Sequence, residues 1–417
     1  MRKNNIISNV LLILLFFLTV SCDNKKEALL HNVITLESTV GKYNLLNLSD
    51  YIEDIKYIPL ETNDSVLIGK GVNIIYENEK IFTRSVAGCY LFDNKGVFCC
   101  EIGNRGQGPD DYLLIANTFI FEKDIYLLDL LGNKLLVYDV NGFLVENNNL
   151  RKLYDIIEKN SEYYFFHHIF PLKKDTFVMN LISPLGYYPK AILFETNQPN
   201  SKMIKEYPNY IKIDKEKYPG FSFCEIGSMY RFKEDVRVYK AINDTIFTIG
   251  QSLEMKEAFI FELGKFKLPL SIIESLDMDA FKNYIIPIEV FESFDHLFIK
   301  FDFGNNSPEP YEITNIAGRR ITQTYVYGVF DKNTGKLSLM EQPIKGILGF
   351  KNDVDNGSII WPHYISSNNE LVTYILPEEF MDYYEQIENP APQMTEIAKK
   401  INFDDNPIVI IAKLKEK

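Results

Sequence analysis

The chain has 417 residues and a formal net charge of −13, with 46% hydrophobic and 14% aromatic residues. This apolar content is enough for a folded core, and no Gly/Ser-rich or Pro-rich linker divides the chain, so we expect one large domain. An acidic surface repels nucleic-acid phosphates, which excludes nucleic acid as a partner. Phe and Tyr are abundant, at 30 and 26 residues, and both favour β-strands.

The N-terminal segment has the features of an export signal. A short basic region precedes the apolar run 10–18, which is too short to span a bilayer comfortably and has the length of a signal-peptide core. The residues that follow, ending in Ser21 and Cys22, resemble a bacterial lipobox. This resemblance implies that residues 1–21 are removed as a signal peptide and that Cys22 is acylated. Two alternatives stay open: an ordinary secretory signal with an incidental cysteine, and a single N-terminal membrane anchor.

Residues 22–49 are expected to form a tether and a lead-in to the domain. Loss of Arg2 and Lys3 with the signal leaves 42 basic against 57 acidic residues, a formal charge of −15, so we expect the lipid to provide the membrane attachment. The charged cluster 23–27 is similar to export signals of surface lipoproteins in the Bacteroidota. The sequence therefore predicts a lipid-anchored protein of the cell envelope, at the periplasmic or surface face of the outer membrane.

Short strand-like runs closed by turn residues dominate the domain. Two units of the form hydrophobic-hydrophobic-Asp-x-x-Gly start at Leu91 and Val137, and a related unit starts at Val329. A period of roughly 40 to 50 residues with about four strands is typical of propeller blades. The alternative, a β-sandwich, explains the strand content but not the repeat. The pattern predicts six blades, at about residues 72–103, 117–150, 163–207, 222–262, 285–340 and from 344 onward.

The two ends of the domain are predicted to close the ring. Residues 55–60 and 408–414 both have strand-like sequences, and two terminal strands in one blade would remove exposed edges. Between them, Pro377 followed by two glutamates suits a helix N-terminus. We therefore expect an all-β, six-bladed propeller with a short helical insertion that extends to about residue 400.

The cysteines after Cys22 lack the C-x-x-C spacing of a zinc site. If a hairpin turn places Phe92 opposite Val97, then Cys89 faces Cys100, close enough for a cross-strand disulfide. The favoured alternative is that these cysteines are buried free thiols on a packed strand.

Five segments carry motifs that together identify a family resemblance. They are Tyr57-Ile-Pro-Leu-Glu-Thr62, the Gly-rich segment 102–112, Asn243-Asp-Thr-Ile-Phe247, residues 350–357 followed by Trp361-Pro362, and Asp405-Asn-Pro407. These motifs resemble the six-bladed β-propeller lipoproteins of the Bacteroidota, which are similar to NHL-type propellers. The resemblance implies a single propeller over residues 50–417 and a location in the cell envelope. It implies no particular activity.

An oxygen-rich run offers one candidate ligand site. Asn352, Asp353 and Asp355 present oxygens that suit a hard cation such as Ca²⁺, or sugar hydroxyls, although the other positions of an EF-hand are missing. The alternative is a polar turn between strands. Trp361, a few residues later, can stack on a sugar or a peptide, and the alternative for Trp361 is packing between blades.

The Gly-rich segment offers a second candidate. Gly103, Gly106 and Gly108 suggest a phosphate loop, but the Gly-Lys-Ser/Thr ending is missing and no helix pattern follows. In a propeller this segment would connect two blades, with glycine allowing positive φ angles. Arg105, at its tip, can then reach a ligand in the central channel.

No sequence motif points to a catalytic residue, since neither Gly-x-Ser-x-Gly nor His-Glu-x-x-His occurs. The favoured function is therefore binding of a glycan, peptide or protein ligand by a lipid-anchored propeller, without catalysis. The alternative is a propeller hydrolase or lyase with an acid, histidine or metal site at the central channel. An aromatic, uncharged channel mouth would favour binding, whereas acids or histidines around an ion would favour the enzyme.

Overall fold

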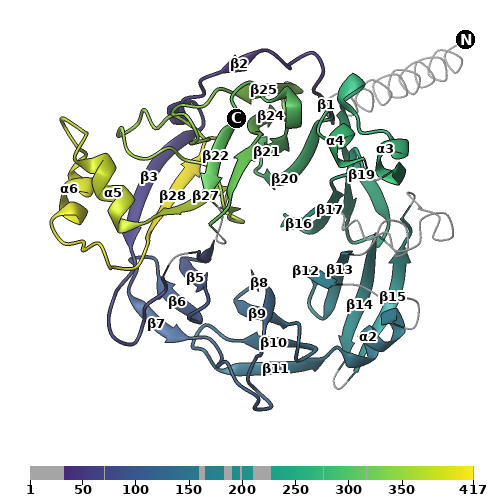
Figure 1. The fold of residues 1–417 in the computed structure, drawn as a ribbon. Helices are drawn as coiled ribbons and strands as arrows, with labels where there is room; N and C mark the ends of the chain where they lie inside the picture. The colour runs from purple at the N-terminus through teal and green to yellow at the C-terminus, as the bar shows by residue number, and fades with distance from the viewer. Residues whose placement is uncertain are drawn as a thin grey trace, which may run out of the picture.

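A computed structural model describes residues 32–69, 71–158, 165–182, 190–197, 200–209, 227–275, 277–314 and 318–416. Within this part of the chain, six sheets form the blades of a β-propeller (Figure 1), as the repeat predicted. Blade 1 comprises β4 (Asn73–Glu77), β5 (Lys80–Arg84), β6 (Cys89–Asp93) and β7 (Phe98–Glu101); blade 2 comprises β8 (Ile115–Phe121), β9 (Asp124–Asp129), β10 (Lys134–Tyr138) and β11 (Leu144–Asn149); blade 3 comprises β12 (Phe165–Lys173), β13 (Thr176–Ile182), β14 (Ala191–Asn197) and β15 (Asn200–Tyr207).

The second half of the ring has the same plan with longer connections. Blade 4 comprises β16 (Gly227–Phe232), β17 (Asp235–Lys240), β18 (Thr245–Ile249) and β19 (Met255–Glu262); blade 5 comprises β20 (Ile286–Glu292), β21 (His296–Asp302), β24 (Tyr325–Asp331) and β25 (Lys336–Met340); blade 6 comprises β26 (Tyr364–Ile365), β27 (Glu370–Ile375), β28 (Ile408–Leu414) and β3 (Ile52–Pro59). The first strand of each blade contacts the first strands of both neighbouring blades, so β4, β8, β12, β16, β20 and β26 surround the central channel.

The ring closes through blade 6, as the terminal strands predicted. β28, near the C-terminus, pairs antiparallel with β27 on one side and with β3, from the N-terminal part of the chain, on the other. Residues separated by more than 300 positions therefore share one sheet, and neither strand is left with an open edge toward the other.

The lead-in before residue 50 adds two further strands to the propeller. β1 (Val33–Thr35) pairs parallel with β19 at the edge of blade 4, and β2 (Tyr43–Asn44) pairs parallel with β25 at the edge of blade 5. Figure 1 shows this segment passing along the outside of the ring before it enters blade 6 as β3. The N-terminal lead-in is thus attached to three successive blades.

Helices occupy the connections between strands. Pro377 is at the start of α5, as expected, and α5 and α6 lie outside blade 6 (Figure 1). No helix in the described residues is long and apolar enough to cross a membrane. The helices and the remaining hairpin are η1 (Leu48–Asp50), α2 (Arg151–Glu158), η2 (Gly264–Phe266), α3 (Leu270–Ser275), α4 (Met278–Phe281), η3 (Gly304–Asn306), α5 (Pro377–Tyr384), α6 (Pro392–Ala398), and β22 (Tyr311–Thr314) with β23 (Arg320–Gln323).

The repeated Asp-x-x-Gly units form the same turn in blades 1 and 2. Asp93 Oδ1 accepts hydrogen bonds from the backbone N–H groups two and four residues ahead, and Asp139 Oδ1 does the same in blade 2. Gly96 and Gly142, which close these turns, both have φ of +83°, a conformation that favours glycine. A short local hydrogen-bond pattern therefore explains the sequence repeat.

The same turn shifts the register that the sequence predicted around the cysteines. Phe92 lies opposite Phe98 rather than Val97, and a β-bulge one step further along the pair places Leu91 opposite Cys100. Cys89 therefore does not face Cys100, and the favoured expectation of free thiols is confirmed. Cys89, Cys99 and Cys100 are free thiols, but only Cys89 is buried, while Cys224 lies outside the described residues.

Each boundary between neighbouring blades has its own apolar core. Between blades 2 and 3, for example, Phe119 and Tyr126 pack against Phe177 and Phe194, all nearly or fully buried. Comparable clusters occupy the other boundaries. A blade exposes two faces and cannot bury both alone, so burial against both neighbours holds the ring together.

Candidate functional site

A groove of about 580 Å³ lies between the connection that leads into blade 6 and the insertion helices. We call it the rim groove. Its walls combine aliphatic side chains with amides, one aromatic ring and two charges. The residues that line it are Leu45, Pro343, Ile344, Ile359 and Ile387; Asn352, Asn356, Gln386 and Asn389; Gly357 and Tyr383; and Lys351 and Glu388.

The predicted oxygen-rich loop forms one wall of the rim groove, but its carboxylates are directed elsewhere. Asp353 accepts hydrogen bonds from the Ser49 backbone N–H at 2.9 Å and from its Oγ at 2.6 Å. Asp355 Oδ1 accepts hydrogen bonds from Asn352 Nδ2 at 2.7 Å and from the Tyr57 hydroxyl at 3.2 Å. The loop, which connects blades 5 and 6, is therefore fastened to the lead-in segment and to β3. Of the three predicted residues, only Asn352 lines the groove.

The charge state of this loop follows from those contacts. Partial burial opposes ionisation of Asp353, but the hydrogen bonds from Ser49 prevail and lower the pKa of its carboxyl. No group of three or more His, Cys, Asp or Glu side chains in the described part of the chain is arranged to hold a metal ion. Calcium binding by Asp353 and Asp355 stays a prediction.

Trp361 lies in the core between blades 5 and 6. Its ring is 8% exposed and stacks on Tyr327 at 4.2 Å between centroids, with Phe350 and Phe298 also in contact. This is the packing between blades that the sequence offered as the alternative to ligand stacking. Its indole Nε1 is buried without a hydrogen-bond partner.

The Gly-rich segment connects blades 1 and 2, as the propeller interpretation expected. Lys134 Nζ, on β10, donates to the carbonyl of Pro109 at 2.8 Å, and the Gly108 N–H donates to Asp111 Oδ2 at 2.9 Å. Bonds of this kind hold the segment against blade 2. Arg105 is exposed at its tip, where its backbone forms a bridge to Tyr112.

A second polar and aromatic surface, absent from the sequence predictions, lies on blades 5 and 6. Glu289, Lys300 and Tyr327 are neighbours in register across three strands of blade 5. The half-buried Lys300 Nζ lies 4.2 Å from the centroid of the Tyr325 ring. This surface combines an acidic, a basic and two aromatic side chains, so it does not by itself separate a binding protein from an enzyme.

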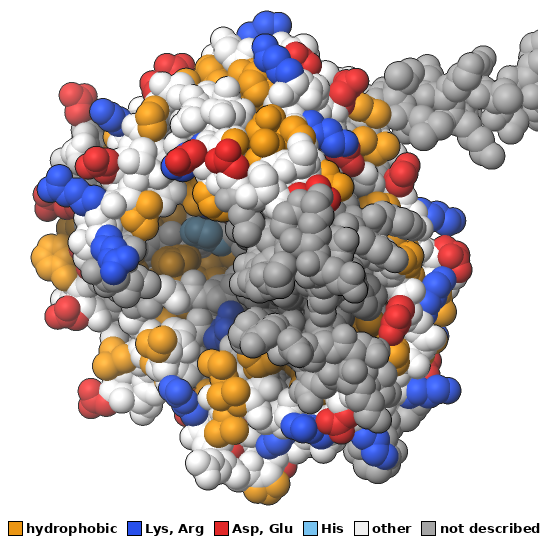
Figure 2. Space-filling model, turned by 45° about the vertical axis from the view of Figure 1, so that its right-hand side comes forward, with side chains coloured by type: hydrophobic (Ala, Val, Ile, Leu, Met, Phe, Trp, Pro, Cys, Tyr) orange, Lys and Arg blue, Asp and Glu red, His pale blue; other side chains and the backbone are white. Residues whose placement is uncertain are grey.

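His363 adds a titratable group to this surface from blade 6. Its Nδ1 lies 2.8 Å from Thr373 Oγ1. The side chain is exposed, yet burial and the nearby Lys300 charge lower its pKa below 6.5. Figure 2 shows a hollow in one face of the propeller that contains a histidine and hydrophobic side chains.

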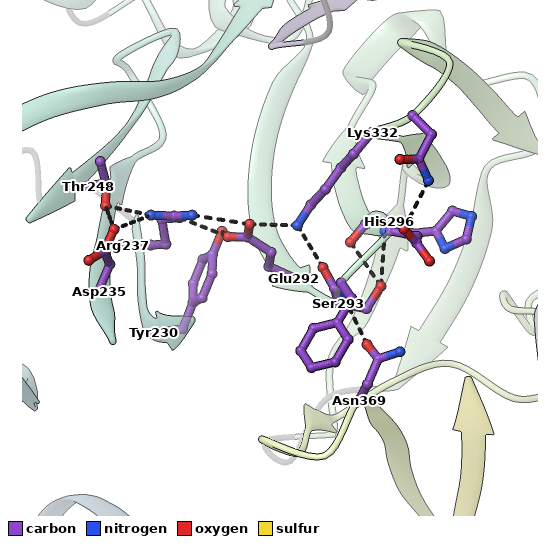
Figure 3. Close-up of polar contacts among 12 residues, drawn as sticks. Tyr230, Asp235, Arg237, Thr248, Glu292, Ser293, His296, Lys332 and Asn369 are labelled. Atoms are coloured by element: carbon purple, nitrogen blue, oxygen red, sulfur yellow. Dashed lines mark hydrogen bonds and ion pairs between the residues drawn. The ribbon is translucent and has the colours of Figure 1, made fainter. Parts of the chain in front are cut away.

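A buried ion network joins blades 4 and 5 at the far ends of their inner strands (Figure 3). The Glu292 carboxylate, which is fully buried, accepts hydrogen bonds from Lys332 Nζ at 2.7 Å, Arg237 Nε at 2.9 Å and the Tyr230 hydroxyl at 3.2 Å. Asp235 lies 3.5 Å from Arg237 Nη1. Two cations and two carboxylates are thus matched, which identifies the network as a structural link between blades.

The network continues into blade 6. Lys332 Nζ also donates to the Ser293 carbonyl at 2.6 Å, and Asn369 Oδ1 accepts the N–H of Phe294 at 2.8 Å (Figure 3). Burial lowers the pKa of Lys332, although Glu292 acts in the opposite direction. Three blades are therefore tied together beside the channel.

Comparison with known proteins identifies the family. Residues 31–413 match the family described as "Domain of unknown function (DUF4934)". The chain belongs to this family. No curated protein matches it.

Two solved structures resemble this DUF4934 protein. The first is a protein of Bacteroides fragilis described as exported, with a TM-score of 0.65 and 17% identity, covering 92% of this chain and 100% of that chain. The second is a member of the DUF4221 family from Bacteroides vulgatus, with a TM-score of 0.48 and 13% identity, covering 90% of this chain and 100% of that chain. At these identities the first likeness supports the propeller fold.

Sequence reasoning missed the charged surface of blade 5 in this DUF4934 protein, although a signal was present. Glu289 and Lys300 each stand between apolar residues within a strand, a pattern that marks a strand position where a side chain leaves the core. Arg237, between two valines on β17, has the same pattern, but its pairing with Glu292 depends on how the blades meet and is not visible in the sequence.

Proposed function

We propose that this DUF4934 protein is an exported lipoprotein, anchored through Cys22 at the outer membrane, whose propeller binds a peptide in the rim groove without catalysis. The N-terminal signal features and the similarity to an exported Bacteroides protein support the envelope location. The finer resemblance, to NHL-like propeller lipoproteins of the Bacteroidota, is part of the same proposal.

The rim groove is the observation that carries the binding function. Its volume of about 580 Å³ is in the size range of ligand sites. Aliphatic side chains such as Ile344, Ile359 and Ile387 provide apolar surface, and the amides of Asn356 and Gln386 can pair with backbone groups of a ligand. A peptide fits this mixture better than a glycan, because sugars are recognised largely by aromatic faces and the groove has a single aromatic residue, Tyr383.

The wall of the groove is fixed before a ligand arrives. Asn352 is 4% exposed, and its side chain is held by Asp355 and Tyr57. On the opposite wall, Gln386 Nε2 donates to the Asp382 carbonyl at 2.7 Å. A preformed wall lowers the entropy that binding has to overcome, which favours affinity for a short segment.

Paired variants test the groove. Peptide and glycan arrays would first identify a ligand, and its affinity would then be measured by titration calorimetry. Ile344→Ser should weaken binding roughly tenfold, because an apolar contact worth more than about 1 kcal/mol is lost. Ile347→Ser is the matched control, since Ile347 is similarly exposed but does not line the groove. If both variants lose the same affinity, or if both bind the ligand as tightly as the wild type does, the rim groove is not the site.

The same ligand separates binding from the alternative of a hydrolase or lyase. Mass spectrometry of the ligand after prolonged incubation should return it intact. Cleavage that persists in Ile344→Ser but is lost in His363→Gln would instead favour a catalytic site at the channel.

Cell fractionation tests the anchor separately. Cys22→Ala should release the protein from the membrane fraction, because a single signal cysteine carries the acyl chains. Cys99→Ala is the control, as Cys99 is an exposed thiol within the propeller. A Cys22→Ala protein that stays membrane-bound and uncleaved would show that the N-terminal segment is a membrane anchor instead of a lipoprotein signal.

A further inference from the structure

One positive charge lies inside the central channel. Arg231 is on β16, the innermost strand of blade 4, and its guanidinium carbon lies 4.7 Å from the centroid of the Phe121 ring. Phe121 is on β8, the innermost strand of blade 2. Blade 3 separates these two blades around the ring, so the space that both inner strands share is the channel. The guanidinium therefore projects into the channel.

The Arg231 side chain has no polar partner among the described residues. Its Nε is shielded from solvent and makes no hydrogen bond to a described residue, and its guanidinium lies against the Phe121 ring. A guanidinium carries five N–H donors in its plane, so an aromatic ring against one face leaves the donors available. Burial lowers the pKa of Arg231, which reflects the cost of keeping this cation away from water.

The neighbouring carboxylate of Glu77 is not hydrogen-bonded to Arg231. Glu77, from β4 of blade 1, accepts hydrogen bonds from the Tyr364 hydroxyl at 2.6 Å and from the Ser367 N–H at 2.8 Å, and its other oxygen pairs with the Ser367 hydroxyl. Its oxygens are thus directed at blade 6. Glu77 and the more distant Glu234 and Glu122 favour the charged form of Arg231 through space.

We propose that Arg231 is an anion-binding residue in the central channel that pairs with a carboxylate group of a small ligand. A guanidinium and a carboxylate form two parallel N–H···O bonds, a geometry that satisfies donors left open by the described residues. Because Glu77, Glu122 and Glu234 act on this position through space, they repel a singly charged carboxylate less than a doubly charged phosphate. This site is separate from the rim groove and does not depend on it.

Two kinds of ligand present such a carboxylate, an acidic sugar and an acidic peptide. The probes are therefore trigalacturonate and triglutamate, each tested beside its methyl ester, with inorganic phosphate as a third anion. Thermal shift and titration calorimetry on the whole propeller should show that at least one acid binds while its ester does not. The arm that binds identifies the source of the carboxylate.

The matched variants are Arg231→Gln and Lys233→Gln. Both remove one positive charge, but Lys233 is exposed in the turn after β16, over the rings of Phe232 and Phe294. Arg231→Gln should lower the affinity for the acidic probe roughly tenfold or more, as expected for loss of a charge-assisted pair. Lys233→Gln should keep the wild-type affinity. Arg231→Lys, which keeps the charge but not the two-pronged geometry, should fall between them.

Several results would overturn the proposal. These are equal binding of acid and ester, unchanged affinity in Arg231→Gln, phosphate binding tighter than either acid, and no response to any acid at about 10 mM, a concentration that detects even weak complexes. The comparison requires that Arg231→Gln without ligand melts like the wild type. If this variant folds poorly, Arg231→Lys provides the same test.

Discussion

Arg231 and Arg237 lie six residues apart in the same hairpin of blade 4, but their surroundings differ: Arg237 is ion-paired, whereas Arg231 lies against an aromatic ring. Arg237, on β17, pairs with Glu292 across the boundary with blade 5 and with Asp235 on its own strand. Arg231, on β16, lies against the Phe121 ring and makes no ion pair with a described residue. Because alternate residues of a strand point to opposite faces of the sheet, Tyr230 joins Arg237 on the side of blade 5, whereas Arg231 lies on the side of blade 3, where it reaches the Phe121 ring. One desolvated cation stabilises the ring, and the other is left for a ligand.

Glu292→Gln should cause the largest loss of stability among these substitutions. It removes the buried carboxylate that Arg237 and Lys332 share, and breaking a buried pair in this way costs about 3–5 kcal/mol of unfolding free energy. Urea unfolding measures the loss. Glu289→Gln, on the same strand but half-buried beside Lys300, is the control and should cost much less. Similar losses in both variants would mean that the boundary network contributes little.

Alkaline pH should weaken the same network. Burial and Glu292 raise the pKa of Tyr230 well above 10.0 in the folded protein, so the unfolded chain releases this proton first as the pH rises past about 10. The unfolding free energy therefore falls there, by at most about 1.4 kcal/mol per pH unit for this group. Tyr230→Phe should flatten the fall and should cost about 1 kcal/mol at neutral pH through the lost hydrogen bond. An unchanged alkaline slope would contradict the assignment.

Arg231→Gln and Arg237→Gln provide the direct comparison. Without ligand, Arg231→Gln should leave the unfolding free energy within about 0.5 kcal/mol of wild type, because the residue has no polar partner to lose. Arg237→Gln should destabilise the propeller by several times that amount, since Glu292 loses its partner. Equal losses, measured in the same urea titrations, would make Arg231 a structural residue and would remove the case for a channel site.

Asp353→Asn should also have a small effect on stability. The exposed carboxylate makes two bonds to Ser49, and solvent screening keeps their combined contribution below about 1 kcal/mol. Its lowered pKa means that this contribution is present above pH 3.8, the ordinary value, and is lost as the pH falls further. Melting with calcium and with chelator tests the cation hypothesis at the same time. A rise with calcium in wild type, absent from the variant, would establish a metal site.

The parts of the fold that could be predicted depend on local patterns. Asp93 and Asp139 each build a turn from their own neighbours, so their spacing reveals the repeat. Pro377 likewise marks the start of α5. The Cys89 register could not be predicted in the same way, because a one-residue offset at the turn and a bulge between Phe98 and Cys100 together move the partner of Cys100 from Cys89 to Leu91.

The candidate sites depend on contacts between distant residues, which a single sequence does not show. Arg231 and Phe121 are 110 positions apart and belong to blades that are not neighbours. The rim groove is formed where Leu45, from the lead-in, meets helix α5 and the connection before blade 6. The sequence placed Asn352 in a polar loop, as the structure has it. It did not show that the neighbouring Asp353 and Asp355 bond to Ser49 and Tyr57, because those contacts depend on the path of the lead-in and β3.

That path has a mechanical consequence for a protein attached to a membrane by its N-terminus. A pulling force on the anchor would act first on β1 at the edge of blade 4, then on β2 at the edge of blade 5, and only then on β3. The Ser49–Asp353 bonds lie between β2 and β3 and would also have to break. The strand that closes the ring is therefore shielded from tension by three weaker attachments, so the lead-in can detach in steps while the propeller stays intact.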